Sequence, residues 1–595
     1  MKNKLNKLLL ITSAVLVVSI FALSALGSVN RIGYLSDFQL NKELSKKNEY
    51  HYSFRIKYHS KIFRNSDVYG VYVDTNKIIK ENNFIKEIKM EKGGSPFGNL
   101  VTPKKIDFEK IDNINYILKI KFSVYLIFGI ILLIFFILYN IKYFQYIIET
   151  PQNSDYIIFF IITLLCFFSY IYSDVLVVFP FSVNFFNVNP LNFFYEVYQK
   201  VGSYHKPDDL PYLAYFIYSI LFLPLWIYSK IRNITYYTWH HAKFEIDTFE
   251  IIYIKLLLLI FVILSSFIIY KISKKIGFND KKSKLSSFMF ITSPFTMIPV
   301  FIISQVEIIM IFFTLLAILD YLNNNKRYIL WFTIAIPLKL FPFFILIPLV
   351  LLKEKQIKKI ALYIIIPILP YIISSILFKS PNPSDRNLVA FGTLMYHKIF
   401  GISIFIMIYS IICLFSYLKN IEDNNVFYKL TIYISFFVFS LIVIVNKSFH
   451  LYWIVIIAPF ISILILFNTY NINIKIMMEF IATLFYSIHI ARAGTMVSMS
   501  EALRTKSIPL IKLFVHNNST KYNNIRDIFP TILGNADITN AIYSFYIMGI
   551  IIMLILFYKY NNYNDNNVNI PRYLIYIRFI PTLFIIFLIW YLSLM

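Results

Sequence analysis

Ser304–Glu307 (SQVE) begins an apolar run. A polar turn follows this run, and the next apolar run contains Pro337–Pro342 (PLKLFP). A third stretch, Asn446–Trp453 (NKSFHLYW), lies further along. All three place amide, carboxylate or cationic side chains within or beside apolar runs. Ionisable groups are costly inside a bilayer and usually have a function there. These stretches therefore predict the functional part of a membrane protein, and the rest of the chain is interpreted as the frame that brings them to one side of the bilayer.

The composition supports a membrane protein. Of the 595 residues, 58% are hydrophobic and only 15% are charged, whereas soluble chains carry about a quarter charged residues. Apolar runs long enough to cross a bilayer, about 20 residues each, recur along the whole chain, and we expect about fifteen of them. The runs are solidly apolar rather than alternating, which excludes a transmembrane β-barrel. The sequence thus predicts an all-α polytopic membrane protein of the cell membrane.

The charge and the cysteines exclude other classes. The net charge is +25, but the lysines lie mostly in short loops between apolar runs, as the positive-inside rule predicts. There is no basic surface domain with interleaved aromatic residues, so we expect no nucleic-acid partner. Cys166 and Cys413 both lie in apolar runs, and two such cysteines form neither a disulfide framework nor a metal-binding pattern.

Near the N-terminus, Tyr52, Phe54, Ile56 and Tyr58 alternate with polar residues, which is typical of a half-buried strand. The runs 68–73 and 116–122 are similar. Changes in composition divide the chain into five regions: 1–27, a membrane anchor or a signal peptide; 28–118, a small external β-rich module; 119–154, a second membrane segment with a cytoplasmic loop; 155–470, the membrane core; and 471–595, C-terminal membrane segments with an external loop at 491–537.

Charge alternation predicts which groups share a face. The basic loops at 271–284, 326–327 and 353–359 all fall on one side, which is then cytoplasmic. Gln305, Glu307 and Lys339 fall on the opposite, external side. The segment 328–352 is short for two full crossings, so we expect a hairpin of partial depth. Pro224 interrupts another run, 211–228, which is expected to enter and leave on one face.

The order of these motifs resembles the integral-membrane glycosyltransferases of the GT-C fold, which use polyprenyl-phosphate sugars. The matching elements are the loop Asp174–Leu210, Gln305–Glu307, Lys339–Pro342 and Asn446–Trp453, with Ser304 and Glu307 where the family usually has Gly and Asp. The resemblance covers about residues 155–470. It implies a GT-C-like helical bundle and a mannosyltransferase-like hexosyltransferase, with a polyprenyl-phosphate sugar as donor, a glycan or protein as acceptor, and an active site facing outward.

Physical chemistry suggests a role for each candidate residue. Sugar transfer needs a base for the acceptor hydroxyl, and Asp174 is the first candidate, with Glu196, Asp208 and Asp209 in the same loop. Glu307, the second catalytic candidate, could bind sugar hydroxyls or a divalent cation. One carboxylate is a poor metal site, so we assign no metal ligands and leave the cation open. The substrate-binding candidates are Gln305 and the cations that would stabilise the departing phosphate, Lys339, Arg386, Lys447 and His450.

Other interpretations stay open. Asp174 could simply end a helix at the interface, Lys339 could be a snorkelling lysine, and Glu307 could cap a helix. A transporter or flippase of lipid-linked saccharides would show internal repeats with paired broken helices, and we find no convincing repeat in the sequence. A polysaccharide polymerase or ligase is a third possibility. The sugar, the acceptor and the linkage do not follow from the sequence.

Overall fold

The structure is a computed structural model of the whole chain. It forms two compact units, one made of Met1–Phe144, His489–Ala541 and Phe584–Met595, and the other of Gln145–Ile488 and Ile542–Leu583. The residues that the structure describes are 28–46, 49–58, 66–67, 79–80, 85–90, 97–107, 114–121, 147–167, 173–201, 210–233, 248–378, 392–446, 451–467, 471–492, 536–558 and 570–594.

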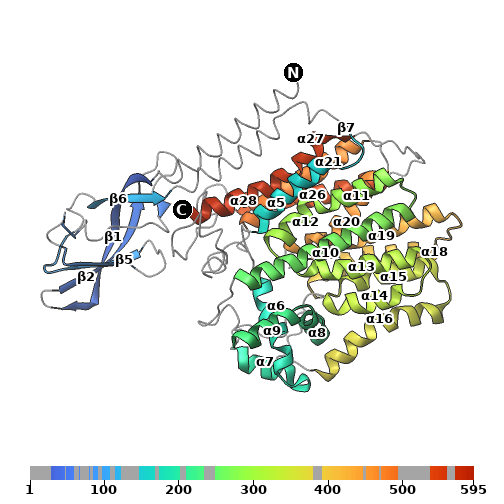
Figure 1. The fold of residues 1–595 in the computed structure, drawn as a ribbon, viewed down its shortest axis with the longest axis horizontal. Coiled ribbons are helices and arrows are strands. Elements are labelled where there is room, and N and C mark those ends of the chain that lie inside the picture. Colours follow the sequence, from blue (N-terminus) through green and yellow to red (C-terminus); the bar gives the residue numbers. More distant parts are fainter. Residues whose placement is uncertain are drawn as a thin grey trace. The chain divides into compact units, whose positions relative to one another are not determined.

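The first unit contains an antiparallel β-sheet (Figure 1). Tyr52 and Phe54 in its second strand are buried, so the period-two alternation correctly predicted a half-buried strand. The run at 116–122 also forms a strand as far as Lys121, the last described residue there, while 68–73 lies outside the described residues. The strand order is β4-β5-β2-β1-β6, with β3 paired to β2, and the strands are β1 (Ser28–Lys46), β2 (Glu49–Tyr58), β3 (Ser66–Asp67), β4 (Glu87–Met90), β5 (Phe97–Thr102) and β6 (Ile114–Lys121).

From residue 153 onward the described part of the chain is mainly helical. The helices are α5 (Asn153–Phe167), α6 (Ser173–Val183), α7 (Phe193–Val201), α8 (Tyr212–Leu221), α9 (Leu223–Arg232), α10 (Thr248–Lys275), α11 (Asp280–Ile291), α12 (Pro294–Thr296), α13 (Glu307–Leu322), α14 (Tyr328–Leu338), α15 (Phe341–Lys353), α16 (Ile357–Leu377), α18 (Ile404–Leu418), α19 (Asn424–Val445), α20 (Ala458–Phe467), α21 (Ile472–Arg492), α26 (Ala536–Tyr558), α27 (Arg572–Ile577) and α28 (Phe579–Leu594). Shorter elements are the 3-10 turns η2 (Asn184–Asn187), η3 (Pro190–Asn192) and η6 (Leu451–Ile457), the π-helical turn η5 (Met297–Ile302), and the strand pairs β7 (Ile147–Ile148) with β10 (Ile570–Pro571) and β8 (Lys398–Ile399) with β9 (Ile402–Ser403).

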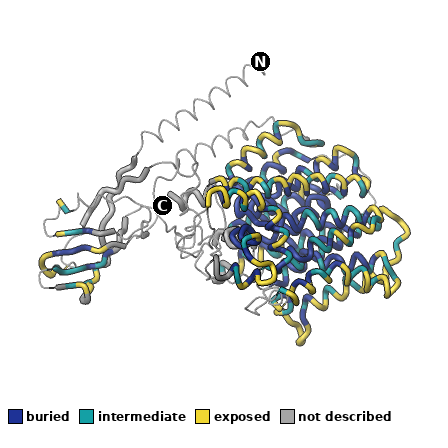
Figure 2. Tube along the Cα trace, turned by 60° about the horizontal axis from the view of Figure 1, so that its bottom comes forward, coloured by how far each residue is buried: buried dark blue, intermediate teal, exposed yellow. Residues whose placement is uncertain are grey.

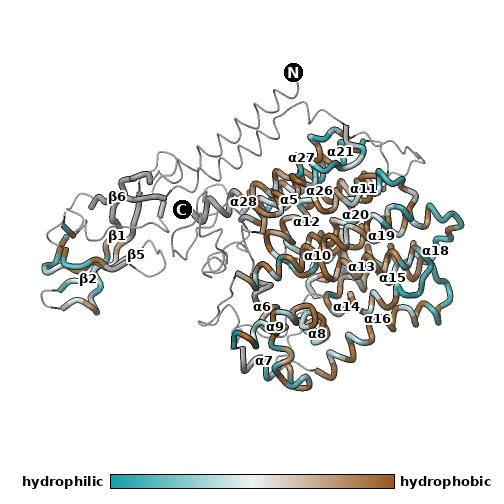
Figure 3. Tube along the Cα trace, in the orientation of Figure 1, coloured by the Kyte–Doolittle hydropathy of each residue, from teal (hydrophilic) through white to brown (hydrophobic). Residues whose placement is uncertain are grey.

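The helices carry the features of a membrane protein. Among the described residues, four helices are long and apolar enough to cross a bilayer, or six spans if each of two bent helix pairs counts as one. Buried residues concentrate on the inner helices, and hydrophobic residues dominate the helix bodies (Figures 2 and 3). Large apolar side chains are also exposed on α10, α16 and α18, as expected of surfaces that face lipid.

The described spans are fewer than the fifteen expected, because several apolar runs form short helices and because the anchor expected at 1–27 and most of the segment expected at 119–154 lie outside the described residues. Five helices of 10 to 17 residues are apolar but too short for the same test. The run 211–228 is also interrupted as predicted: α8 and α9 meet at an angle of 69°, and Pro224 lies in the first turn of α9, where its missing N–H costs nothing.

Helices α14 and α15 form a hairpin at the predicted position, while its partial depth in the membrane stays a prediction. At one end of α13, Glu307 is 3.2 Å from the Nζ of Lys339, which follows α14. At the other end of α13, the Tyr321 hydroxyl donates a hydrogen bond of 2.6 Å to the Leu349 carbonyl of α15, and its ring contacts that of Tyr328 at the start of α14. Helix α14 therefore runs back along α13, the chain reverses at Lys339, and α15 returns in the opposite direction. Lys339 itself has an extended backbone conformation.

Helices α21 and α26 approach closely at Gly549. A Cβ atom at this position would lie 2.6 Å from the Cβ of Ala482, so replacing Gly549 with alanine forces the helices apart. We expect the free energy of unfolding to fall by about 1–3 kcal/mol, measured by thermal unfolding in detergent. The control is Gly392→Ala, because a Cβ at Gly392 meets nothing within 4 Å. An unchanged melting temperature for Gly549→Ala would contradict the close packing.

Candidate functional site

The site is built on a break in a membrane helix. The segment α11–α12–η5 is bent by 47° between Ile291 and Pro294. Pro294 and Pro299 lack the N–H that a continuous helix needs, and η5 is a π-helical turn. Ser304 then takes a left-handed backbone conformation with φ 65°, which is uncommon for a residue other than glycine. The chain re-enters a regular helix only at Glu307, the first residue of α13.

A buried ion pair lies directly after this break. Glu307 Oε1 is 3.2 Å from Lys339 Nζ, and their side chains are only 7% and 17% exposed. The ammonium group also lies 3.8 Å from the ring centre of Trp453, whose ring packs against that of Phe341. Carboxylate and indole face together stabilise the ammonium in an apolar environment. The three sequence motifs therefore meet here, with Glu307, Lys339 and Trp453 each supplied by a different one.

Several polar atoms at this break have no hydrogen-bond partner elsewhere in the described parts of the chain. They are Ser304 Oγ, Gln305 Nε2 and Glu307 Oε2, and all three atoms are buried. Buried polar atoms are almost always hydrogen-bonded, so this cluster within four consecutive residues is unusual. An amide N–H donates, a carboxylate oxygen accepts, and a serine hydroxyl does both. A hydroxyl-bearing ligand complements this set, because each of its hydroxyl groups can both donate and accept.

The other predicted residues are not brought into this cluster by any contact that the structure describes. Asp174 lies in the first turn of α6, and its side chain is outside the described residues. Glu196 of α7 accepts a hydrogen bond of 2.9 Å from the Asn189 backbone N–H, so it stabilises a local turn. The remaining candidates lie outside the described residues: Arg386, Lys447, His450, Asp208 and Asp209.

Two aromatic residues near the pair were not among the predicted site residues. Trp453 belongs to a predicted motif, but an aromatic residue beside an apolar run is equally typical of the aromatic belt at a membrane interface. Tyr218 of α8 is buried and lies within electrostatic range of Glu307. Nothing in the sequence distinguishes Tyr218 from the rest of the 46 tyrosines in the chain. The residue types around the pair suit a polar ligand. In the described ranges, no group of three or more His, Cys, Asp or Glu residues is placed to bind a metal ion.

No protein-family model matches this chain, and no curated protein is significantly similar to it. The resemblance to GT-C glycosyltransferases stays a prediction that rests on the residues quoted above.

Proposed function

We propose that this protein is a membrane glycosyltransferase of the GT-C type, which moves a sugar from a polyprenyl-phosphate donor to a glycan or protein acceptor on the external face. The observation that carries the proposal is the Glu307–Lys339 pair beside Trp453, together with the buried polar atoms of Ser304, Gln305 and Glu307 that have no partner among the described residues. A lipid-phosphate sugar has both an anion for the lysine and hydroxyl groups for the amide and the carboxylate.

The proposed reaction assigns a step to each group. The acceptor oxygen attacks the anomeric carbon of the sugar and loses its proton to Asp174. The bond from that carbon to the phosphate oxygen breaks, and the phosphate keeps the electron pair. Lys339 stabilises the charge that grows on the phosphate, because an ammonium has three N–H donors and only one is directed at Glu307. Gln305 and Glu307 orient the sugar through its hydroxyl groups.

A transporter of lipid-linked saccharides is the second candidate, and one observation favours it. Two spans are bent, α8–α9 by 69° and α11–α12–η5 by 47°, and transporters commonly place their binding sites at broken helices. A transporter would move the donor across the bilayer and form no glycosidic bond.

Replacing Asp174 with asparagine tests the enzyme function. Asparagine keeps the size and polarity of the side chain but not its basicity, so we expect turnover to fall by about 10² or more, with donor binding nearly unchanged. The measurement is transfer from a radiolabelled polyprenyl-phosphate sugar in proteoliposomes. Glu196→Gln is the matched control, because Glu196 is engaged with Asn189 and its loss should leave turnover nearly unchanged.

The outcomes separate the candidates. Full activity of Asp174→Asn would show that this assignment is wrong, and the base would then be sought among Glu307, Asp208 and Asp209. Donor crossing the bilayer without any glycosidic product in the wild type would overturn the enzyme function in favour of the transporter.

A further inference from the structure

The break before Glu307 leaves a backbone carbonyl without its helical partner. In a continuous α-helix the Phe301 carbonyl would accept from the N–H of Gln305, four residues later. Here the Gln305 N–H instead donates to the Pro299 carbonyl at 3.0 Å. A carbonyl group released in this way inside a membrane is costly unless another group satisfies it, because no water is available there to form a hydrogen bond with it.

Lys255 of the neighbouring helix α10 satisfies that carbonyl. Its Nζ donates to the Phe301 carbonyl at 3.1 Å and to the Cys166 carbonyl, in the last turn of α5, at 3.4 Å. The residue is only 2% exposed. A buried ammonium is costly unless it is well compensated, and carbonyls at the ends of helices carry partial negative charge. The same contact thus stabilises the lysine and ties the end of η5 to α5 and α10.

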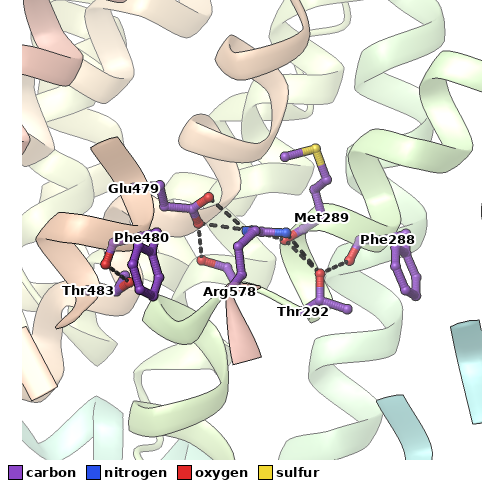
Figure 4. A network of polar contacts seen from close by, with 8 residues as sticks. Phe288, Met289, Thr292, Glu479, Phe480, Thr483 and Arg578 are labelled. Atoms are coloured by element: carbon purple, nitrogen blue, oxygen red, sulfur yellow. Dashed lines mark hydrogen bonds and ion pairs between the residues drawn. The ribbon is translucent and has the colours of Figure 1, made fainter. Parts of the chain in front are cut away.

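A second buried basic side chain performs the same task at the start of the broken segment. The Ser293 N–H donates to the Phe290 carbonyl at 3.2 Å rather than to Met289, its α-helical acceptor. Arg578 donates to the released Met289 carbonyl at 2.7 Å and is itself paired with Glu479 (Figure 4). Ser293 Oγ in turn donates to Glu479 Oε1 at 2.7 Å. Both ends of the irregular segment are therefore held by basic side chains from other parts of the chain, Lys255 of α10 and Arg578 between α27 and α28.

We propose that Lys255 is a positioning residue of the candidate site: by holding the Phe301 carbonyl, it sets the turn that presents Gln305 and brings Glu307 to Lys339. Only three residues separate Phe301 from Gln305, so a shift of the carbonyl displaces the turn at Ser304. The nature of the ligand rests on the proposed function, whereas the positioning concerns the Glu307–Lys339 contact itself.

The test measures that contact without any activity assay. A hydrophobic carbodiimide reacts with carboxyl groups in their neutral form, and Glu307 is shielded while Lys339 pairs with it. The rate at which carbodiimide labels Glu307 in purified protein, followed by mass spectrometry, reports on the pair. Lys339→Met, which removes the ammonium directly, gives the reference rate for a broken pair.

In Lys255→Met we expect Glu307 to be labelled faster than in the wild type, at a rate that approaches the reference rate of Lys339→Met, because the displaced carboxylate loses the ammonium group that shields it. Lys255→Arg keeps a cation with several donors and should restore slow labelling. The matched control is Lys355→Met. Lys355 also donates to helix-end carbonyls, those of Leu351 and Ser416, but it has no contact with the broken segment among those described.

Labelling at the wild-type rate in Lys255→Met would overturn the proposal, as would equally fast labelling in Lys355→Met. If Lys255→Met does not fold, Lys255→Gln is compared with the wild type, and an unchanged rate in that variant overturns the proposal in the same way. A wild type that forms no glycosidic product would overturn the proposed function while leaving this comparison intact, so the two failures are distinguishable.

Discussion

Replacing Arg578 with methionine is expected to lower the free energy of unfolding by about 3–5 kcal/mol, the cost of leaving one member of a buried ion pair without its partner. Arg578 and Glu479 are both fully buried, and two guanidinium nitrogens bind the two carboxylate oxygens at 2.8 and 2.9 Å. A third, Nη1, donates to the Thr292 hydroxyl at 3.0 Å. The methionine removes all of these contacts and leaves the buried Glu479 carboxyl group without its cationic partner. Thermal or denaturant unfolding in detergent measures the loss.

The control is an ion pair on the surface. Lys281 and Glu149 approach to 2.7 Å with both side chains exposed, so Lys281→Met should change stability by less than about 1 kcal/mol. Adding Glu479→Leu to Arg578→Met removes the stranded charge and should recover part of the loss, giving a non-additive double-mutant cycle. Equal losses of stability in Arg578→Met and Lys281→Met would show that the buried network stabilises the fold no more than a surface ion pair does.

Replacing Lys339 with alanine is expected to lower sugar transfer by about 10²–10³, the size typical of losing one charge-stabilising group at a reaction centre. Donor binding should weaken as well, because the phosphate of the donor is already charged in the ground state. Lys339→Arg keeps the positive charge and should retain part of the activity. Donor affinity and single-turnover transfer in proteoliposomes separate the two effects.

Lys326→Ala is the matched control for this result. Lys326 lies in the turn between α13 and α14, at the opposite end of the helix pair from Glu307, and is exposed. Its loss should leave transfer and donor affinity at the wild-type level. Unchanged transfer in Lys339→Ala would contradict a role for the ammonium in binding the phosphate.

Part of the candidate site could be anticipated without coordinates. Alternation of the basic loops put Glu307 and Lys339 on one side of the membrane, and the structure brings them to 3.2 Å. Trp453 could not be assigned in the same way, because an aromatic residue at the end of an apolar run is equally typical of an interfacial belt. No feature of the sequence indicated that Tyr218 lies near the site, since tyrosines in apolar runs are common in this chain.

The sequence by itself determined the helical membrane class, the half-buried strand around Tyr52 and Phe54, and the hairpin at Lys339. These features depend on hydropathy, periodicity and short-range geometry, which neighbouring residues specify. Only the tertiary structure decided how the break before Glu307 is stabilised. The Phe301 and Met289 carbonyls lose their helical donors and gain Lys255 and Arg578 instead. Those basic side chains come from segments distant in sequence, and a hydrogen bond between remote segments leaves no periodic pattern in the chain.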